Sequence, residues 1–164
     1  MMKYIIGVLV QNHPGVLSRV SGLFSRRGFN IDSLAVWPTQ DENVSRITLV
    51  VNGDEYIVDQ VMKQLGKLID VIEVKDITAN SVARELVLIK VNADAKTRSE
   101  IMQIANVFQA KVVDITVDFI TIEATGNTNK TLALEEMLKQ YGIKEMVRTG
   151  VVAIERGSKS LGQQ

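Results

Sequence analysis

Hydrophobic and polar residues follow two different periods along the start of this chain. Residues 4–10 form a short apolar run that is typical of a strand, and residues 16–24 carry apolar side chains at helical spacing. Gly28 stands where a C-terminal cap of that helix would lie. The polar stretch between them, residues 11–15, is therefore predicted to be a tight turn that joins a strand directly to a helix.

The same reading predicts strand, helix, strand, strand, helix, strand in each half of the chain. In the first half the strands are expected at 4–10, 29–37, 46–51 and 71–77, and the second helix at 57–68. In the second half the strands are expected at 84–92, 111–117, 119–124 and 143–154, and the helices at 101–108 and 134–141. The fold class is predicted as α+β, with two tandem ferredoxin-like (βαββαβ) domains.

Local motifs support these element ends. Residues 97–100 have the capping-box form, Asn127 offers a cap to the last helix, Pro14 suits the first turn of the first helix, and Gly150 is expected to form a bulge. The predicted domain bounds are 1–78 for the first domain, 79–83 for a linker, 84–157 for the second domain and 158–164 for a flexible tail. Because the turn at residues 11–15 and the apolar strand at 29–37 both lie before the linker, a fragment ending near Ala83 is expected to keep dimerisation and ligand binding.

Composition excludes several function classes. The 164 residues are 46% hydrophobic, so a real core is available, and 19 basic residues balance 19 acidic ones. This balance argues against nucleic-acid binding, which needs a basic face, and against a polybasic membrane anchor. No apolar run approaches the length of a membrane-spanning helix. The chain has no cysteine, which fits the cytoplasmic location that we predict.

Catalytic and metal-binding residues are not expected. His13 is the only histidine, with no carboxylate or nucleophile near it in sequence, so we interpret it as an exposed turn residue or a loop contact with a ligand. The adjacent acidic pairs fall in loops or in first helical turns, where acids favour solvent and the helix dipole. No nucleotide-binding loop is present. We therefore predict no catalytic residue, no metal site and no cofactor.

RNA binding is a rival function for this fold class. RNA-recognition domains stack bases on aromatic side chains of their two central strands. The predicted strand 46–51 holds no aromatic residue, and Phe119 stands at a strand start without an aromatic partner. RNA binding is therefore not expected. Trp37 is interpreted as a packing or interface residue.

The turn at residues 11–15 is the strongest candidate for a binding site. Gly15 allows close approach of a ligand, and the N–H groups of Gly15, Val16 and Leu17 would lack intrahelical acceptors at the positive end of the helix dipole. Such a turn can hold a small carboxylate or a phosphate. Asn12 adds an amide beside it. An ordinary strand-to-helix turn, without a ligand, is the other interpretation.

An oligomer is predicted from the strand at 29–37, which is too apolar to lie exposed at the edge of a sheet. Pairing of edge strands from two copies would cover it. The sequence does not choose which edge is used.

Four segments resemble one known family. Gln11–Val20 resembles the first loop and helix of ACT domains. Leu23–Leu34, Ser45–Thr48 and Val147–Gly157 resemble the small, regulatory subunit of acetohydroxyacid synthase (acetolactate synthase). The resemblance covers almost the whole chain, in order.

This resemblance implies a regulatory subunit without catalytic activity. Its expected partners are the thiamine-diphosphate-dependent catalytic large subunit, which it would activate, and a second copy, through a homodimer of ACT domains. It also implies feedback inhibition by valine, whose preference over leucine or isoleucine comes from the family alone. The expected effector-binding residues are Asn12, Gly15, Val16 and Leu17 of one chain with Asn30 and Ile31 of its neighbour.

Gln11 departs from the family, where an acid is frequent at this position. A weaker response, or a slightly different effector, is expected if that acid holds the ligand's ammonium group. The alternative function is a self-standing ACT-type amino-acid-binding module that serves another enzyme or a transcriptional role.

Overall fold

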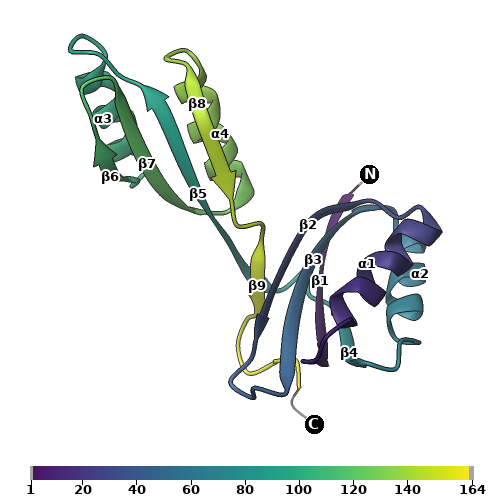
Figure 1. Cartoon of the computed structure of the whole chain (residues 1–164). Helices are drawn as coiled ribbons and strands as arrows, with labels where there is room; N and C mark the ends of the chain where they lie inside the picture. The colour runs from purple at the N-terminus through teal and green to yellow at the C-terminus, as the bar shows by residue number, and fades with distance from the viewer. Residues whose placement is uncertain (1, 163–164) are drawn as a thin grey trace. The chain divides into compact units, whose positions relative to one another are not determined.

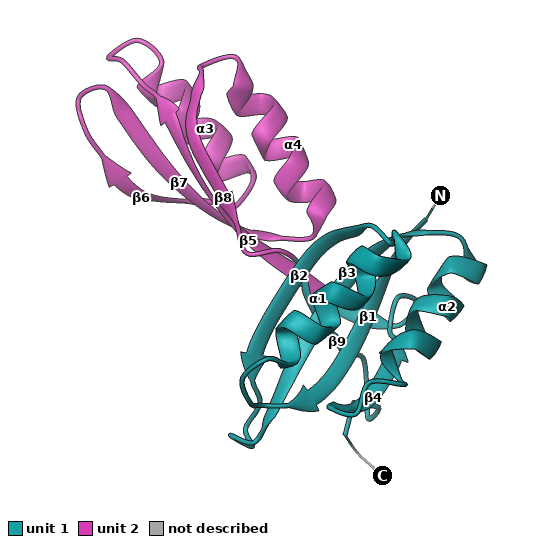
Figure 2. Ribbon diagram, turned by 45° about the vertical axis from the view of Figure 1, so that its right-hand side comes forward, with its two compact units in different colours: residues 1–82, 151–164 teal, residues 83–150 magenta. Residues whose placement is uncertain are grey.

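The computed structural model describes residues 2–162, which form two compact units (Figures 1 and 2). Unit 1 holds the residues up to Val82 together with those from Val151 onward, and unit 2 holds Ala83–Gly150. Each unit combines two helices with an antiparallel sheet, which confirms the predicted α+β class. The units differ from the expected domain bounds because the C-terminal segment belongs to unit 1.

Unit 1 places two helices on one face of its sheet. Its elements are β1 (Met2–Gln11), α1 (Val16–Arg27), β2 (Ile31–Pro38), β3 (Val44–Gly53), α2 (Glu55–Leu65), β4 (Val71–Asp76) and β9 (Val152–Glu155). The sheet order is β2-β3-β1-β4. One core cluster includes Val8 from β1, Phe24 from α1 and Leu65 from α2, all buried. Both helices therefore cover the same side of the sheet.

Unit 2 repeats this arrangement. Its elements are β5 (Ser81–Asn92), which begins in unit 1, α3 (Arg98–Val107), β6 (Lys111–Ile115), β7 (Phe119–Gly126), α4 (Thr128–Lys139) and β8 (Ile143–Arg148). The order β6-β7-β5-β8 corresponds position by position to β2-β3-β1-β4. The two predicted βαββαβ units are therefore confirmed.

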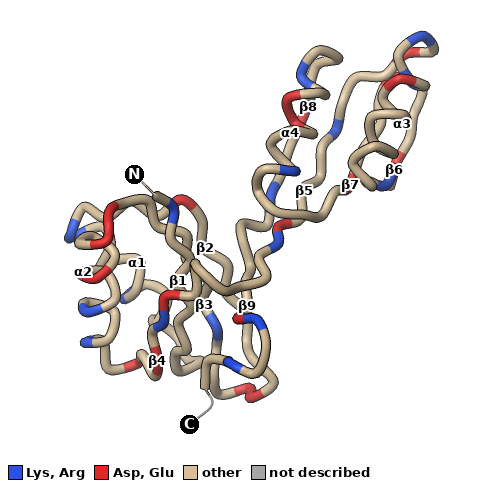
Figure 3. Tube along the Cα trace, turned by 180° about the vertical axis from the view of Figure 1, so that it is seen from behind, with Lys and Arg blue, Asp and Glu red and all other residues tan. Residues whose placement is uncertain are grey.

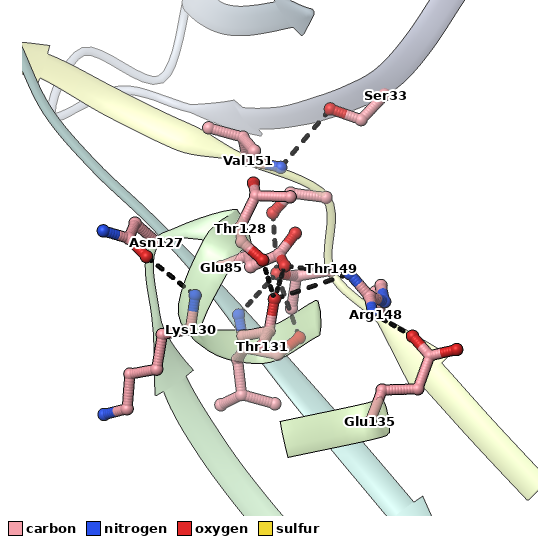
Figure 4. A network of polar contacts seen from close by, with 12 residues as sticks. Ser33, Glu85, Asn127, Thr128, Lys130, Thr131, Glu135, Arg148, Thr149 and Val151 are labelled. Carbon is pink, nitrogen blue, oxygen red and sulfur yellow. Dashed lines mark hydrogen bonds and ion pairs between the residues drawn. The ribbon is translucent and has the colours of Figure 1, made fainter. Parts of the chain in front are cut away.

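A buried polar network links β5, α4 and β8 of unit 2 (Figure 4). Glu85 of β5 is buried and accepts from the hydroxyl of Thr131 in α4 and from Nη1 of Arg148 in β8, the latter at 3.1 Å. Nη2 of Arg148 donates to Glu135 at 2.6 Å. A buried carboxylate is costly unless it is paired, and this network supplies both partners.

Local chemistry sets most helix ends as predicted. Gly28 caps α1 in the left-handed conformation, and the side chain of Asn127 accepts from the Lys130 N–H at the start of α4. The prediction of a capping box at 97–100 was wrong, because the Thr97 side chain makes no capping hydrogen bond to α3. Asp94 instead accepts from the N–H groups of Lys96 and Thr97, each at 2.8 Å.

The predicted last strand, residues 143–154, is two strands. β8 ends at Arg148 and β9 begins at Val152, and Gly150 between them has φ 79°. The left-handed backbone at Gly150 breaks the strand where the sequence predicted a bulge. The break coincides with the return of the chain from unit 2 to unit 1.

Residues 151–162, here called the C-terminal strap, cover the helix-free face of the unit 1 sheet. Nη2 of Arg46 donates to the Ala153 carbonyl at 2.6 Å, and Nζ of Lys75 lies 2.8 Å from Oε2 of Glu155. A β carbon on Gly7 would come within 3.0 Å of the Leu161 side chain. The expected flexibility of residues 158–164 stays a prediction, and residues 163–164 lie outside the described part.

Burial on this face follows from the strap. Strand side chains alternate between the two faces, so Leu9 and Val50 point away from the core that holds Val8 and Leu49. Both are nonetheless buried, at 7% and 5% exposure. The unit 1 sheet is therefore covered on both faces.

Candidate functional site

The turn between β1 and α1 has the open geometry that the sequence predicted. Gly15 is the N-cap of α1, with φ 90° and ψ −13°. Residues with a β carbon rarely adopt this left-handed conformation, so the turn requires glycine. The expectation that Pro14 lies in the first helical turn was wrong, because the conformation of Gly15 delays the helix to Val16.

The amides of this turn are available to a ligand. Val16 N–H lies 3.5 Å from the His13 carbonyl, which is a long contact, whereas the Gly15 carbonyl accepts from Arg19 N–H at 3.0 Å. Within residues 2–162 the N–H groups of Gly15 and Leu17 have no hydrogen-bond acceptor. Gly15 and Leu17 are exposed. Open donors at the start of a helix favour an anion.

Asn12 stands beside these amides with a fixed side chain. Its Nδ2 donates to the Glu42 carbonyl at 2.7 Å, and its backbone N–H donates to the Asn43 carbonyl at 2.8 Å. Both contacts tie the turn to the connection between β2 and β3. Because the amide nitrogen is used, Oδ1 remains as the group that can accept from a ligand ammonium.

Asp70 holds the same turn from the other side, and sequence reasoning missed it. Its carboxylate lies 2.9 Å from Nε2 of His13 and 2.6 Å from Nε of Arg19. Its backbone carbonyl accepts from Gln11 N–H at 2.8 Å. Asp70 is 6% exposed. More than 50 positions separate it from His13 and Arg19, so no local pattern could have indicated the contact.

Val16 contributes differently from the other predicted site residues. Its side chain is 5% exposed and belongs to the core of unit 1, so it offers a ligand only its amide. Leu17 is 43% exposed and can line a pocket. Of these two residues, only Leu17 offers a ligand an apolar side chain at the described turn.

Asn30 and Ile31 lie at the opposite end of the sheet from this turn. Ile31 pairs with Val51, and Val51 pairs with Tyr4, whereas the turn follows Gln11. Tyr4 and Gln11 are seven positions apart, about 24 Å along a strand. Asn30 is exposed, and its Nδ2 lies 3.5 Å from Oδ1 of Asp32. One chain therefore does not bring all six predicted site residues together.

The edge strand β2 carries exposed apolar side chains. It pairs with β3 alone in the sheet of unit 1. Trp37 is 79% exposed and Val36 is 39% exposed. An exposed apolar edge of this kind offers unpaired backbone groups to another strand.

The corresponding turn of unit 2, between β5 and α3, differs in its chemistry. Hydrogen bonds from the backbone amides of Thr97 and Lys96 lower the pKa of the Asp94 carboxyl. The carboxylate that satisfies these amides thus belongs to the chain itself. The N-cap amide of this turn, that of Thr97, is therefore bound within the chain, whereas the N-cap amide of Gly15 has no acceptor among the described residues.

Charge and metal-ligand patterns offer no second site. Basic and acidic positions are interspersed along both units (Figure 3). Within the described residues there is no cluster of three or more His, Cys, Asp or Glu side chains that could hold a metal ion. No helix among these residues is long and apolar enough to cross a membrane.

Comparison with known proteins covers both units. Residues 6–73 match a model of the acetohydroxyacid synthase small subunit-like ACT domain, and residues 84–157 match a model of the small subunit of acetolactate synthase. A Mycolicibacterium smegmatis protein named acetolactate synthase small subunit is 51% identical over 160 residues, which cover 97% of this chain and 94% of that protein.

Two further relatives also carry the name of acetolactate synthase small subunits. An Archaeoglobus fulgidus protein with the name "Probable acetolactate synthase small subunit" is 53% identical, over 96% of this chain and 99% of its own length. The crystal structure of the acetolactate synthase small subunit from Thermotoga maritima superposes with a TM-score of 0.90 at 37% identity, over 97% of this chain and all of that one. These relatives are named as small subunits of the synthase, which is a regulatory and not a catalytic role. The chain belongs to the acetolactate synthase small-subunit family.

Proposed function

We propose that this chain binds and activates the catalytic large subunit of acetohydroxyacid synthase and makes the complex sensitive to valine. The full-length match to small subunits supports the partner. The single observation that carries the sensing role is the turn at Gly15, whose open amides lie at the start of α1 in an ACT domain. The thiamine diphosphate of the reaction would belong to the large subunit.

A site made by two chains fits the separation of the predicted residues. In a two-fold homodimer joined along β2, the two edge strands run antiparallel. Ile31 of one copy then comes level with the Pro38 end of the other. Pro38 pairs with Ser45, which pairs with Val10 beside the turn. The dimer would thus bring Asn30 and Ile31 of one copy to the end of the sheet that carries the turn of the other.

The chemistry of this site suits a small free amino acid. The amides of Gly15, Val16 and Leu17 would hold its carboxylate, and Oδ1 of Asn12 or Asn30 would accept from its ammonium group. The side chains of Leu17 and Ile31 would contact its apolar side chain. One methylene changes the binding free energy by only about 1–3 kcal/mol in such a pocket. The preference for valine over leucine or isoleucine is therefore proposed from the family resemblance.

Gln11 bears on the strength of the response. Its side chain is exposed at the end of β1, and its backbone N–H donates a hydrogen bond to the Asp70 carbonyl. A neutral side chain here gives the ligand ammonium less electrostatic stabilisation than an acid would. We therefore propose a weaker valine response than in relatives with an acid at this position.

The test is a synthase assay of the large subunit with and without this chain, and with and without valine. Higher turnover on addition of the chain, lost again with valine, supports the proposal. The purified chain should show no turnover with pyruvate, thiamine diphosphate and magnesium. Amino-acid binding without any effect on the synthase would favour the self-standing binding module. The cytoplasmic location stays a prediction.

A further inference from the structure

Arg19 lies one helical turn after Gly15, and its side chain returns over the start of α1. Helical side chains lean toward the N-terminus, so residues four positions apart meet on one face. Nη1 of Arg19 lies 3.4 Å from where a β carbon on Gly15 would be. The guanidinium therefore stands directly beside the turn whose amides are open.

Asp70 fixes this position while leaving the outer guanidinium nitrogens available. Nε of Arg19 donates to Oδ2 of Asp70 at 2.6 Å, and Oδ1 of Asp70 lies 2.9 Å from Nε2 of His13. The side chain of Asp70 is 7% exposed, whereas that of Arg19 is 47% exposed. An approaching anion therefore meets Nη1 and Nη2 of Arg19, while the carboxylate of Asp70 is enclosed.

A β carbon on Gly15 would lie in van der Waals contact with the guanidinium of Arg19, 3.4 Å from Nη1 and 4.0 Å from Nη2, so glycine leaves the space beside the guanidinium open. The donors on both sides of this space suit the two oxygens of a carboxylate. We propose that Arg19 is a further effector-binding residue, which meets the carboxylate of the bound amino acid together with the amides of Gly15, Val16 and Leu17. Asp70 is a positioning residue for it. This inference rests on the proposed function.

The test compares two ligands on four variants of the full-length chain. Valine carries the carboxylate, and valinamide has the same shape without it. Titration by calorimetry, or by NMR for weak binding, is run on the wild type, Arg19→Gln, the double variant Arg19→Gln/Asp70→Asn and Arg26→Gln. The double variant replaces the pair without leaving a buried carboxylate unpaired. Arg26 is exposed on the same helix and is the matched control.

Both Arg19 variants should lose about 10- to 100-fold in valine affinity, the size expected for a lost charge-assisted hydrogen bond. Valinamide should bind equally, or equally poorly, in every variant, and Arg26→Gln should match the wild type with both ligands. Unchanged valine affinity in the double variant overturns the role of Arg19. An equal loss for valine and valinamide overturns it too, since that marks a damaged turn. A wild type that binds no valine refutes the proposed function itself.

Discussion

The two strand-to-helix turns of this protein occupy the same place in the same fold and differ in how their N-cap amides are bonded. Among the described residues the N-cap amide of Gly15 has no acceptor, whereas Asp94 accepts from the amides of Lys96 and of the N-cap residue Thr97 in the turn between β5 and α3. Two units of the same topology therefore present different chemistry at equivalent turns. A carboxylate such as that of Asp94 competes with a ligand carboxylate for the amides of its turn.

The two sheets differ in a second respect. The helix-free face of the unit 1 sheet lies under the C-terminal strap, and Val50 there is 5% exposed. On the corresponding face of unit 2, Leu88 is half-buried and Val147 is 57% exposed. The strap therefore covers the helix-free face of the unit 1 sheet, whose edge strand β2 remains available for pairing.

Gly15→Asp should give this turn a carboxylate that accepts from its own amides, as Asp94 does in unit 2. The new carboxylate would occupy the amides and repel a ligand carboxylate, and two like charges at 4 Å cost about 4 kcal/mol at an effective dielectric near 20. Valine affinity should fall about a thousandfold. Isothermal titration measures the change.

Gly28→Asp is the matched control for this substitution. It places the same residue at another left-handed position, φ 67°, at the other end of α1. A loss of less than tenfold for Gly15→Asp would show that the amides are not where the carboxylate binds.

Removal of the C-terminal strap should destabilise unit 1. A chain that ends at Gly150 exposes Leu9 and Val50 and loses the contacts of Leu161. We expect the free energy of unfolding to fall by about 3 kcal/mol, the order of magnitude for one large apolar side chain and the surface it covers. Urea denaturation followed by circular dichroism gives the value.

The strap also changes the expectation for the isolated first domain. A fragment that ends near Ala83 lacks residues 151–162 and should be less stable than one in which those residues are joined back by a short linker. Val147→Ser, on the open face of unit 2, is the control for strap removal in the longer chain and should change its free energy of unfolding little. Equal stability of the two fragments would show that the strap is only a passive tail.

Asp94→Ala gives the smallest expected effect, a lower melting temperature for unit 2 without a change in valine binding. The pKa of Asp94 is lowered by its amide hydrogen bonds, so its contribution is present above the ordinary pKa near 4 and is lost as pH falls through the lowered value. The difference in melting temperature between wild type and variant should therefore narrow below about pH 4. Asp114→Ala, on the exposed strand β6, is the control.

The order of elements could be predicted from the sequence because it depends on local patterns. Apolar periodicity gave both βαββαβ units, and Gly28 and Asn127 marked helix ends that the structure confirms. The prediction of one strand over 143–154 was wrong because apolar residues stand on both sides of the short segment 148–150, as they would in a single strand. Its division depends on contacts such as Glu155 with Lys75, 80 positions apart in the chain.

The candidate site could be predicted only in part for the same reason. The turn at Gly15 carries a local signal, and the structure gives it the open amides that were expected. Asp70 acts on His13 and Arg19 through contacts between distant segments, which no pattern in one sequence indicates. Val16 follows the apolar helical spacing and is buried as that spacing indicates, so it can serve the core with its side chain and a ligand only with its amide.

The central claim is that the site lies between two chains, and mixed dimers test it most directly. Gly15→Asp damages the turn, and Asn30→Ala should cost about 1–3 kcal/mol of binding if it leaves a buried group unpaired. Each mutant homodimer should lose valine response at both sites. In a dimer with one chain of each kind, a site that joins Gly15 of one chain to Asn30 of the other leaves one site with both lesions and one intact. Titration of purified mixed dimers with valine should show one site of wild-type affinity per dimer, and the absence of any such site would contradict the account.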